Sequence, residues 1–421
     1  MHKIKLTFKS FVFGLLSILL FCNVNGIINN LFGVEAVLSP LILALSFCLM
    51  VIVRPKKKLF STPFFSFILT LVSLWYFGII SGIIHYDETN FKNVDLFHAS
   101  RLIFTSCLIF YVFSGYISTL TDRQKLNHIM FIFFLFILTS SFGVLESLFG
   151  LRPVALGINY DQERTLGFFG NPNLTGLQAN FSLAMIIGLF FKNKLNTLLT
   201  LILIPIVLYA AIATFSKTAI ITSSLFLILF ILICIRNLFK INHKSQAKNS
   251  LYVLTTLTII IFGLILPAGM TYYDQLGTGQ QKRLLSVVDV VTKGKFDRKT
   301  SSLRSDIFKD GIEIIKKDVV WGHGLSTFSI GGMFKSSPTH GVHNMFLKLF
   351  GEGGFIPLMF FIIFLCSISL KAIQNKKREY FHLCLFTMLA FSLFCLASHN
   401  VMEEKFAVAL LAILVGVISD D

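Results

Sequence analysis

Charged side chains are scarce in this chain. Only 14% of its 421 residues are Asp, Glu, Lys or Arg, whereas hydrophobic residues account for 55%. A typical soluble domain carries about 25% charged residues, and a chain this apolar lacks the polar groups that a folded surface needs in water. The composition therefore excludes a soluble globular domain and favours a membrane protein.

Motifs for disulfides, metals and nucleotides are missing as well. The seven cysteines lie inside apolar runs and none forms a CxxC pair, which is typical of small apolar helix residues. The sequence contains no GxxxxGKS/T loop, no HExxH and no GxSxG, so we expect no cofactor, no metal and no hydrolysis of ATP. The net charge of +16 would suit nucleic acid. However, Lys and Arg lie in short clusters between apolar runs, so we expect no nucleic-acid partner.

The sequence does contain a series of long apolar runs. A transmembrane helix needs about 20 such residues, and the chain offers about twelve candidate segments. The first follows Lys3, Lys5 and Lys9 and has no small-residue cleavage site, so we interpret it as an uncleaved helix, although Asn23 and Asn25 interrupt it. The expected spans are residues 11–29, 35–53, 63–84, 101–120, 128–149, 174–191, 197–214, 218–235, 250–269, 354–372, 380–397 and 405–418. This pattern predicts an all-α, polytopic transmembrane helix bundle.

The basic residues predict the orientation of the spans. With the N-terminus in the cytoplasm, every second connection is enriched in Lys and Arg, as the positive-inside rule requires. The inside segments hold Lys3, Lys5, Lys9, Arg54, Lys56, Lys57, Lys58, Arg123, Lys125, Lys192, Lys194, Arg236, Lys240, Lys244, Lys248, Lys371, Lys376, Lys377 and Arg378. The short outside connections hold Lys92, Arg101, Arg152, Arg164, Lys217 and Lys405. We therefore expect both termini to be cytoplasmic.

One connection is much longer than the others. We expect residues 1–269 to contain the first nine spans, residues 270–353 to form a long extracytoplasmic loop, and residues 354–421 to contain the last three spans. Long loops do not contribute to the positive-inside rule, and a long ordered loop usually serves a function. Apolar residues at helical spacing predict a helix over 301–318 in this loop, with Ser301 or Ser302 as its N-cap and Arg304 near its start.

Polar residues gather in the short outer connections too. Arg164 precedes Gly-Phe-Phe-Gly-Asn171-Pro-Asn173, where Gly and Asn-Pro predict a turn into the next span with Asn173 as N-cap. Lys217 lies in a very short connection, at or just within the membrane interface. Such a cation either extends its amine to the surface or binds an anion, and the sequence favours neither interpretation.

Histidines mark the end of the long loop. Two Gly residues around His323 predict a turn, and His343 and Asn344 precede a predicted helix over 345–350 that ends at Gly-Glu352. The N-terminus of such a helix favours anions. His340 and His343 would suit a metal, but no carboxylate or Cys lies nearby at ligand spacing.

Taken together, these residues resemble a known signature. The O-antigen ligase and O-antigen polymerase family has a similar pattern, carried here by Arg304, Gly-His323-Gly-Leu-Ser-Thr-Phe, His343-Asn344 and Gly-Glu352-Gly-Gly. Arg164 and the Asn171-Pro-Asn173 turn are similar to the outer loop that precedes it in that family. The resemblance covers residues 160–370 and, by the number of spans, the whole chain. Where it leads us to expect an outer Arg, this chain has Lys217, which keeps the charge but loses the bidentate geometry.

The resemblance implies glycosyl transfer on the outer face of a bacterial cytoplasmic membrane. The donor would be a glycan on undecaprenyl diphosphate, and the acceptor a sugar hydroxyl on another lipid-linked repeat or on a glycolipid such as lipid A-core. Arg164, Lys217 and Arg304 would stabilise the diphosphate, and His343 would accept the hydroxyl proton. A chain-length regulator is a possible partner. The expected binding or positioning residues are Asn171, Asn173, His323, Asn344 and Glu352.

Several functions stay open. We favour a repeat-unit polymerase slightly over a ligase, because a polymerase needs only one class of substrate. A transporter of lipid-linked glycans is the rival from another class, and about twelve spans would suit it. Transporters carry ionisable residues near the membrane midplane, however, whereas the charges here lie near the ends of the spans. A passive scaffold would require neither Arg304 nor His343.

Overall fold

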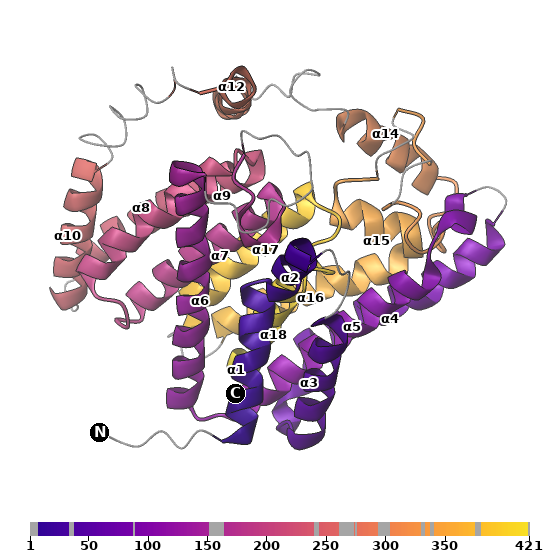
Figure 1. The fold of residues 1–421 in the computed structure, drawn as a ribbon, viewed down its shortest axis with the longest axis horizontal. Coiled ribbons are helices and arrows are strands. Elements are labelled where there is room, and N and C mark those ends of the chain that lie inside the picture. Colours follow the sequence, from indigo (N-terminus) through magenta and orange to yellow (C-terminus); the bar gives the residue numbers. More distant parts are fainter. Residues whose placement is uncertain are drawn as a thin grey trace.

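A computed structural model describes residues 7–32, 38–86, 89–150, 164–239, 244–260, 273, 276–293, 304–329, 333–336, 341–374 and 380–419. These residues form helices and connections and contain no strand (Figure 1). The all-α prediction is therefore confirmed.

The helices follow the apolar runs. Among the described residues, six helices are long and apolar enough to cross a membrane: α4 (Thr62–Ile84), α5 (Leu96–Thr119), α6 (Asp122–Phe149), α7 (Pro172–Phe191), α9 (Lys217–Leu238) and α16 (Phe355–Gln374). Shorter apolar helices are α1 (Phe8–Phe21), α3 (Leu38–Ile52), α8 (Thr197–Ala213), α17 (Phe381–Ala397) and α18 (Lys405–Ile418). The described residues also form α2 (Val24–Phe32), α10 (Lys244–Ile260), α12 (Thr278–Lys293), α14 (Arg304–Ile315), α15 (Met345–Gly353) and the 3-10 turns η1 (Lys57–Leu59), η2 (Asn90–Asn93) and η3 (Gly167–Phe169). The figure of about twelve spans stays a prediction, because the ninth run extends beyond α10 into residues outside the described ones.

The first expected span is divided in two. α1 ends at Phe21, α2 begins at Val24, and between them Asn23 adopts a positive φ of 45°, which Asn tolerates better than most residues. Its Nδ2 donates a hydrogen bond to the carbonyl oxygen of Phe168 at 2.8 Å. The break therefore ties the first helices to the loop that precedes α7.

Two helices form the centre of the bundle. Every residue of α18 from Phe406 to Ile418 is buried, and most of α7 is buried as well. α18 packs against α5 and α7 packs against α17. A methyl group on Gly416 would lie 2.8 Å from the carbonyl oxygen of Ser114, and one on Gly188 would lie 2.7 Å from Cα of Leu383. Small residues allow these close approaches, as is usual between membrane helices.

Two buried amide side chains of α7 form hydrogen bonds with neighbouring helices. Nε2 of Gln178 donates to the carbonyl oxygen of Phe136 at 2.8 Å. Nδ2 of Asn180 donates to the carbonyl oxygen of Ala219 at 3.2 Å, and its Oδ1 accepts from Oγ of Ser223 at 3.0 Å. Neutral amides thus connect α6, α7 and α9 without leaving polar groups exposed to lipid.

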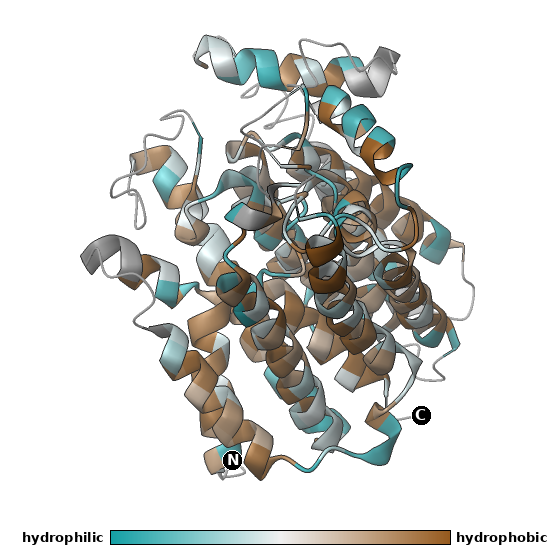
Figure 2. Ribbon diagram, turned by 90° about the vertical axis from the view of Figure 1, so that its right-hand side faces the viewer, coloured by the Kyte–Doolittle hydropathy of each residue, from teal (hydrophilic) through white to brown (hydrophobic). Residues whose placement is uncertain are grey.

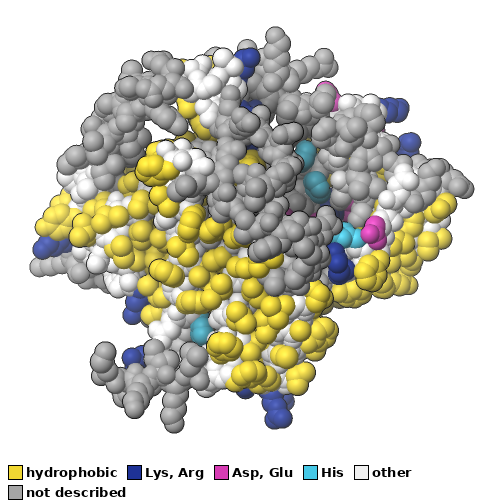
Figure 3. Space-filling model, viewed as in Figure 1, with side chains coloured by type: hydrophobic (Ala, Val, Ile, Leu, Met, Phe, Trp, Pro, Cys, Tyr) yellow, Lys and Arg dark blue, Asp and Glu magenta, His cyan; other side chains and the backbone are white. Residues whose placement is uncertain are grey.

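The polar connections divide between the two ends of the bundle. Figure 2 shows hydrophobic residues through its middle, and Figure 3 shows a broad apolar band on one face with most basic side chains near its margins. α12 and α14 lie at the end opposite to the start of α1 and the end of α18 (Figure 1). Nζ of Lys192, after α7, lies 3.3 Å from the centre of the Tyr380 ring, before α17. Two connections predicted to be inside therefore meet, while the cytoplasmic assignment itself stays a prediction.

Candidate functional site

Arg164 and Lys217 lie at the same turn. Nε of Arg164 donates to the carbonyl oxygen of Thr214 at 2.9 Å. Ser216 is the N-cap of α9 and Lys217 is its first residue. Phe215 between them has a φ of 47°, which bends the chain sharply. We call Arg164 with residues 214–217 the cationic turn: two basic side chains and the positive end of the α9 dipole occur together there.

A buried carboxylate holds the Arg164 loop in place. Oε1 of Glu146 accepts from the amide of Leu166 at 3.0 Å, and its Oε2 accepts from the amide of Gly167 at 2.7 Å. The hydroxyl of Thr175 on α7 donates to the carbonyl oxygen of Leu166. Because all three contacts fix the main chain immediately after Arg164, they help to hold its side chain against residues 214–217.

The prediction that Asn173 caps α7 is wrong by two residues. Asn171 is the N-cap, and its side chain accepts from the amide of Asn173 at 2.9 Å. Pro172 occupies the first turn, where its fixed φ fits and its missing N–H is not needed. Both asparagines thus start α7 beside the Arg164 loop.

The predicted helix after Asn344 is confirmed and runs slightly further, as α15. Asn344 is its N-cap: Oδ1 accepts from the amide of Leu347 at 2.9 Å, and Nδ2 donates to the carbonyl oxygen of Leu396 at 3.2 Å. The ring of His343 lies 5.6 Å, centre to centre, from that of His399. Burial, followed by the charges of Lys348 and His343, lowers the pKa of His399 to about 3. His399 is therefore neutral at physiological pH and adds no positive charge beside His343.

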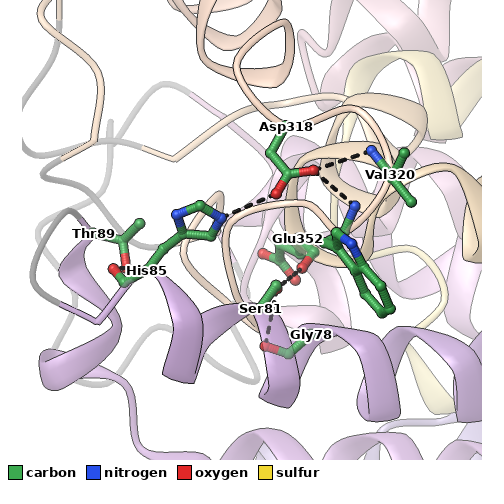
Figure 4. Close-up of polar contacts among 8 residues, drawn as sticks. Gly78, Ser81, His85, Thr89, Asp318, Val320 and Glu352 are labelled. Carbon is green, nitrogen blue, oxygen red and sulfur yellow. Dashed lines mark hydrogen bonds and ion pairs between the residues drawn. The ribbon is translucent and has the colours of Figure 1, made fainter.

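His323 and Glu352 both lie where the loop meets α15 and α4, and Figure 4 draws the Glu352 part of this cluster. The amide of His323 donates to the carbonyl oxygen of Gly351 at 2.7 Å. Oγ of Ser81 donates to the carbonyl oxygen of Glu352 at 3.3 Å (Figure 4). The Glu352 side chain is fully buried, and its Oε1 accepts from Oγ of Ser329 at 2.7 Å. These contacts hold the loop that contains His323 against α15 and α4.

A second contact fastens the loop to α4. Nε2 of His85 lies 3.1 Å from Oδ2 of Asp318 (Figure 4). Oδ1 of Asp318 accepts from the amides of Val320 and Trp321 at 3.2 and 3.0 Å. The His85 ring also lies 5.4 Å from that of His323. These contacts therefore hold the turn that contains His323 at the end of α4.

Arg304 is the first residue of α14. The helix predicted over 301–318 is present as Arg304–Ile315, and the proposed caps Ser301 and Ser302 lie outside the described residues. α14 packs against α15, where Ile307 and Leu347 belong to one buried apolar cluster. The backbone of Arg304 is thus on a helix that covers α15, while its role in chemistry stays a prediction.

Sequence reasoning missed a polar cavity near the start of α18. Its volume is about 300 Å³, and Asn23, Phe169, Glu403, Glu404 and Lys405 are among the lining residues. Nζ of Lys348, a residue buried in α15, forms an ion pair with Oε1 of Glu403. The cavity thus lies between the loop that follows Arg164 and a segment bound to α15. Three consecutive charged residues between two apolar runs were the signal in the sequence.

Comparison with known proteins gives one result that bears on this geometry. Residues 199–362 match the family model described as O-antigen ligase. This part of the chain is similar to the O-antigen ligase family. The match begins within α8 and ends within α16, so it includes Lys217, Arg304, His323, His343 and Glu352. No curated protein matches the chain significantly.

The O-antigen ligase domain thus confirms the resemblance found in the sequence. It supports a membrane enzyme of glycosyltransferase type that uses a lipid-linked glycan and an acceptor. Arg164, Asn171 and Asn173 precede the matched residues. In the fold they nevertheless adjoin the domain, because Arg164 is hydrogen-bonded to Thr214 inside it.

Proposed function

We propose that this protein transfers a glycan from undecaprenyl diphosphate to a sugar hydroxyl on the extracytoplasmic face of a bacterial cytoplasmic membrane. We further propose that it acts as the polymerase of O-antigen, capsule or exopolysaccharide repeat units. The observation that carries the proposal is the meeting of Arg164 and Lys217 at one turn of an otherwise apolar bundle. The similarity of residues 199–362 to the O-antigen ligase family supports it.

The cationic turn would bind the leaving group. When the acceptor oxygen attacks the anomeric carbon, the bond to the diphosphate breaks and negative charge develops on undecaprenyl diphosphate. Fixed cations at a water-poor interface stabilise such charge strongly. The first N–H groups of α9 would add to this effect, since Lys217 begins that helix. Arg304 would complete the set from α14.

His343 would act as the general base. It precedes the N-cap of α15, and a neutral imidazole is suited to accept the proton of the attacking hydroxyl. The neighbouring His399, whose pKa burial lowers to about 3, would leave His343 free of a second cationic ring. Asn344 would fix the backbone at this point, because its side chain bonds both α15 and the end of α17.

His323 and Glu352 would be positioning residues in this scheme. Both are buried, with exposed fractions of 5% and 0%. Their contacts are to the loop and to α4 rather than to an open cavity. They would keep the loop against α15. His343 and α14 would then keep their positions relative to the cationic turn.

The test is the surface glycan of a deletion strain complemented with wild type, His343→Ala, Arg304→Ala or Lys217→Ala. Lys194→Ala, at an exposed site between α7 and α8, is the matched control. We expect single repeats to accumulate on their lipid anchor with the three site variants, and normal polymer with the control. Normal glycan from well-expressed His343→Ala would refute the assigned base.

A ligase is the second candidate, because the matching family is described by that activity. The same gels discriminate: a ligase variant would leave full-length polymer on undecaprenyl diphosphate rather than single repeats. A lipid-linked glycan transporter is disfavoured by the placement of polar groups. Among the buried polar side chains of α7, Gln178 and Asn180 are neutral amides bonded to neighbouring helices.

A further inference from the structure

An apolar groove runs along the outside of the bundle between α3, α4 and α5. Its volume is about 590 Å³, and its lining includes Phe47, Phe64, Ile68, Leu108 and Tyr111. Along α5 the lining extends from Arg101 to Tyr111, which corresponds to about 15 Å of helix. The groove is open on one side and follows the direction of the membrane-spanning helices, as the binding site of a lipid tail would.

A cation lies at one end of this groove. Arg101 is the lining residue nearest to the start of α5, and its Nη2 lies 3.0 Å from Nδ1 of His98. A guanidinium at the margin of an apolar groove complements a tail that carries a phosphate. A groove for an uncharged lipid would not need this charge.

The groove adjoins the polar cavity. Ile42 and Leu102 line the cavity, whereas their sequence neighbours Leu43 and Arg101 line the groove. α3 and α5 therefore form a wall that the two spaces share. Phe169, which follows Arg164 in the loop leading to α7, also lines the cavity.

The charges near this junction favour an anion. Lys405 at the cavity and Arg101 at the groove are close enough for their positive charges to interact. Glu403 is bound to Lys348. Burial, followed by the charge of Glu403, raises the pKa of Glu404 to about 8, so this carboxyl is mostly protonated at neutral pH. The excess charge at the junction is therefore positive.

We propose that the groove holds the isoprenoid tail of the acceptor substrate, with Arg101 on its diphosphate and its sugars in the polar cavity. The inference rests on the proposed polymerase function. A polymerase holds two polyprenyl diphosphates at once, and the repeat unit on the acceptor separates its diphosphate from the hydroxyl that attacks. Two separate cationic positions meet that requirement: the cationic turn for the donor, and Arg101, beside the cavity-lining Leu102, for the acceptor.

The first experiment measures lipid binding by the full-length protein in nanodiscs. The probe is undecaprenyl diphosphate with a photoreactive group in its tail, and crosslinked peptides are identified by mass spectrometry. We expect crosslinks to α3, α4 and α5, and about tenfold weaker labelling in Arg101→Ala, since a hydrogen bond to a charged group is lost. Arg101→Lys should keep most of the labelling because it keeps the charge.

A steric variant tests the groove itself. Leu108→Trp would fill it, whereas Leu69→Trp places the same side chain at an exposed position of α4 outside the lining. We expect labelling to fall only with Leu108→Trp. Equal labelling of both variants, or equal competition by phosphatidylglycerol and by undecaprenyl diphosphate, would overturn the proposal, because the groove would then be an ordinary lipid-facing surface.

Kinetics separate this inference from the proposed function. With purified donor and acceptor, Arg101→Ala should raise the KM for the acceptor about tenfold and leave the KM for the donor unchanged. Normal polymerisation without groove labelling would overturn the acceptor site alone. Groove labelling by a wild-type protein that forms no polymer would overturn the proposed function and, with it, the assignment of the lipid as an acceptor.

Discussion

The ion pair between Lys348 and Glu403 gives a sharp test of how α15 is held in place. Lys348 is 2% exposed and lies on α15, one turn before the buried Glu352. Its Nζ contacts Oε1 of Glu403 in the connection that leads to α18. Lys348→Ala would therefore remove the only basic side chain of α15 and leave two carboxyl groups near each other.

The expected cost is substantial because Lys348 is buried, although Glu403 keeps 28% of its side chain exposed. Truncation of a fully buried pair costs about 3–5 kcal/mol, so partial hydration of Glu403 should bring the cost to the lower end of this range or slightly below it. Burial lowers the pKa of Lys348, but the charges of Glu403 and Glu352 outweigh it, so its pKa is raised from the usual 10.5. The stabilisation is therefore fully present at neutral pH and is lost only as the pH rises through this raised pKa.

The assay is reversible unfolding of the purified protein in detergent micelles, compared with Lys194→Ala, an exposed control that should change stability by less than about 0.5 kcal/mol. Glu403→Ala should cost less than Lys348→Ala, because Lys348 would keep Glu352 one turn away. A stability of Lys348→Ala within about 1 kcal/mol of wild type would refute the reasoning.

Three further predictions concern the site and the bundle. Lys217→Ala should reduce the rate of glycan transfer by about 10²–10³-fold in a turnover assay at equal expression, because a cation that stabilises the transition state is lost. Lys217→Arg should keep most of the activity. Full activity of Lys217→Ala would contradict this prediction. Burial raises the pKa of Asp318, but hydrogen bonds from backbone amides and from His85 lower it below the usual 3.8, so the contact with His85 persists at neutral pH and is lost only as the pH falls through the lowered pKa. Asp318→Asn should therefore increase deuterium uptake in the following turn at pH 7, and unchanged uptake would count against the contact. Gly416→Ala should destabilise the bundle by about 1–3 kcal/mol because of overpacking, whereas Gly14→Ala, at an open position, should not; equal unfolding curves would show that α18 can shift.

The helices were predictable from the sequence because lipid requires continuous apolar segments. The helix after Asn344 was predictable too, since a capping residue precedes an apolar stretch. Because a proline such as Pro172 usually breaks a helix, the sequence predicted the start of α7 two residues too late. A proline nevertheless fits well in the first turn of a helix. The asparagines in the first run indicated that this span is interrupted. The geometry of the break at Asn23, however, depends on a contact with Phe168 that the sequence does not indicate.

The sequence predicted the candidate site residues, but it did not predict which residues contact one another. Arg164 and Lys217 were recognised as polar outliers, and only the fold shows that they share a turn. His85 and Asp318 are separated by 233 positions, and Lys348 and Glu403 by 55. Such pairs depend on how helices pack, and a single sequence contains no local pattern for them.

The buried position of α18 has a consequence for biogenesis. The ribosome delivers α5 and α7 to the membrane long before α18, yet α18 occupies the centre of the bundle and packs closely against Ser114 through Gly416. Until α18 inserts, lipid has to occupy the place of a helix, so the bundle closes late. A chain arrested before this step would lack the central helix of its bundle. We expect the proteases that remove unassembled membrane proteins to degrade it.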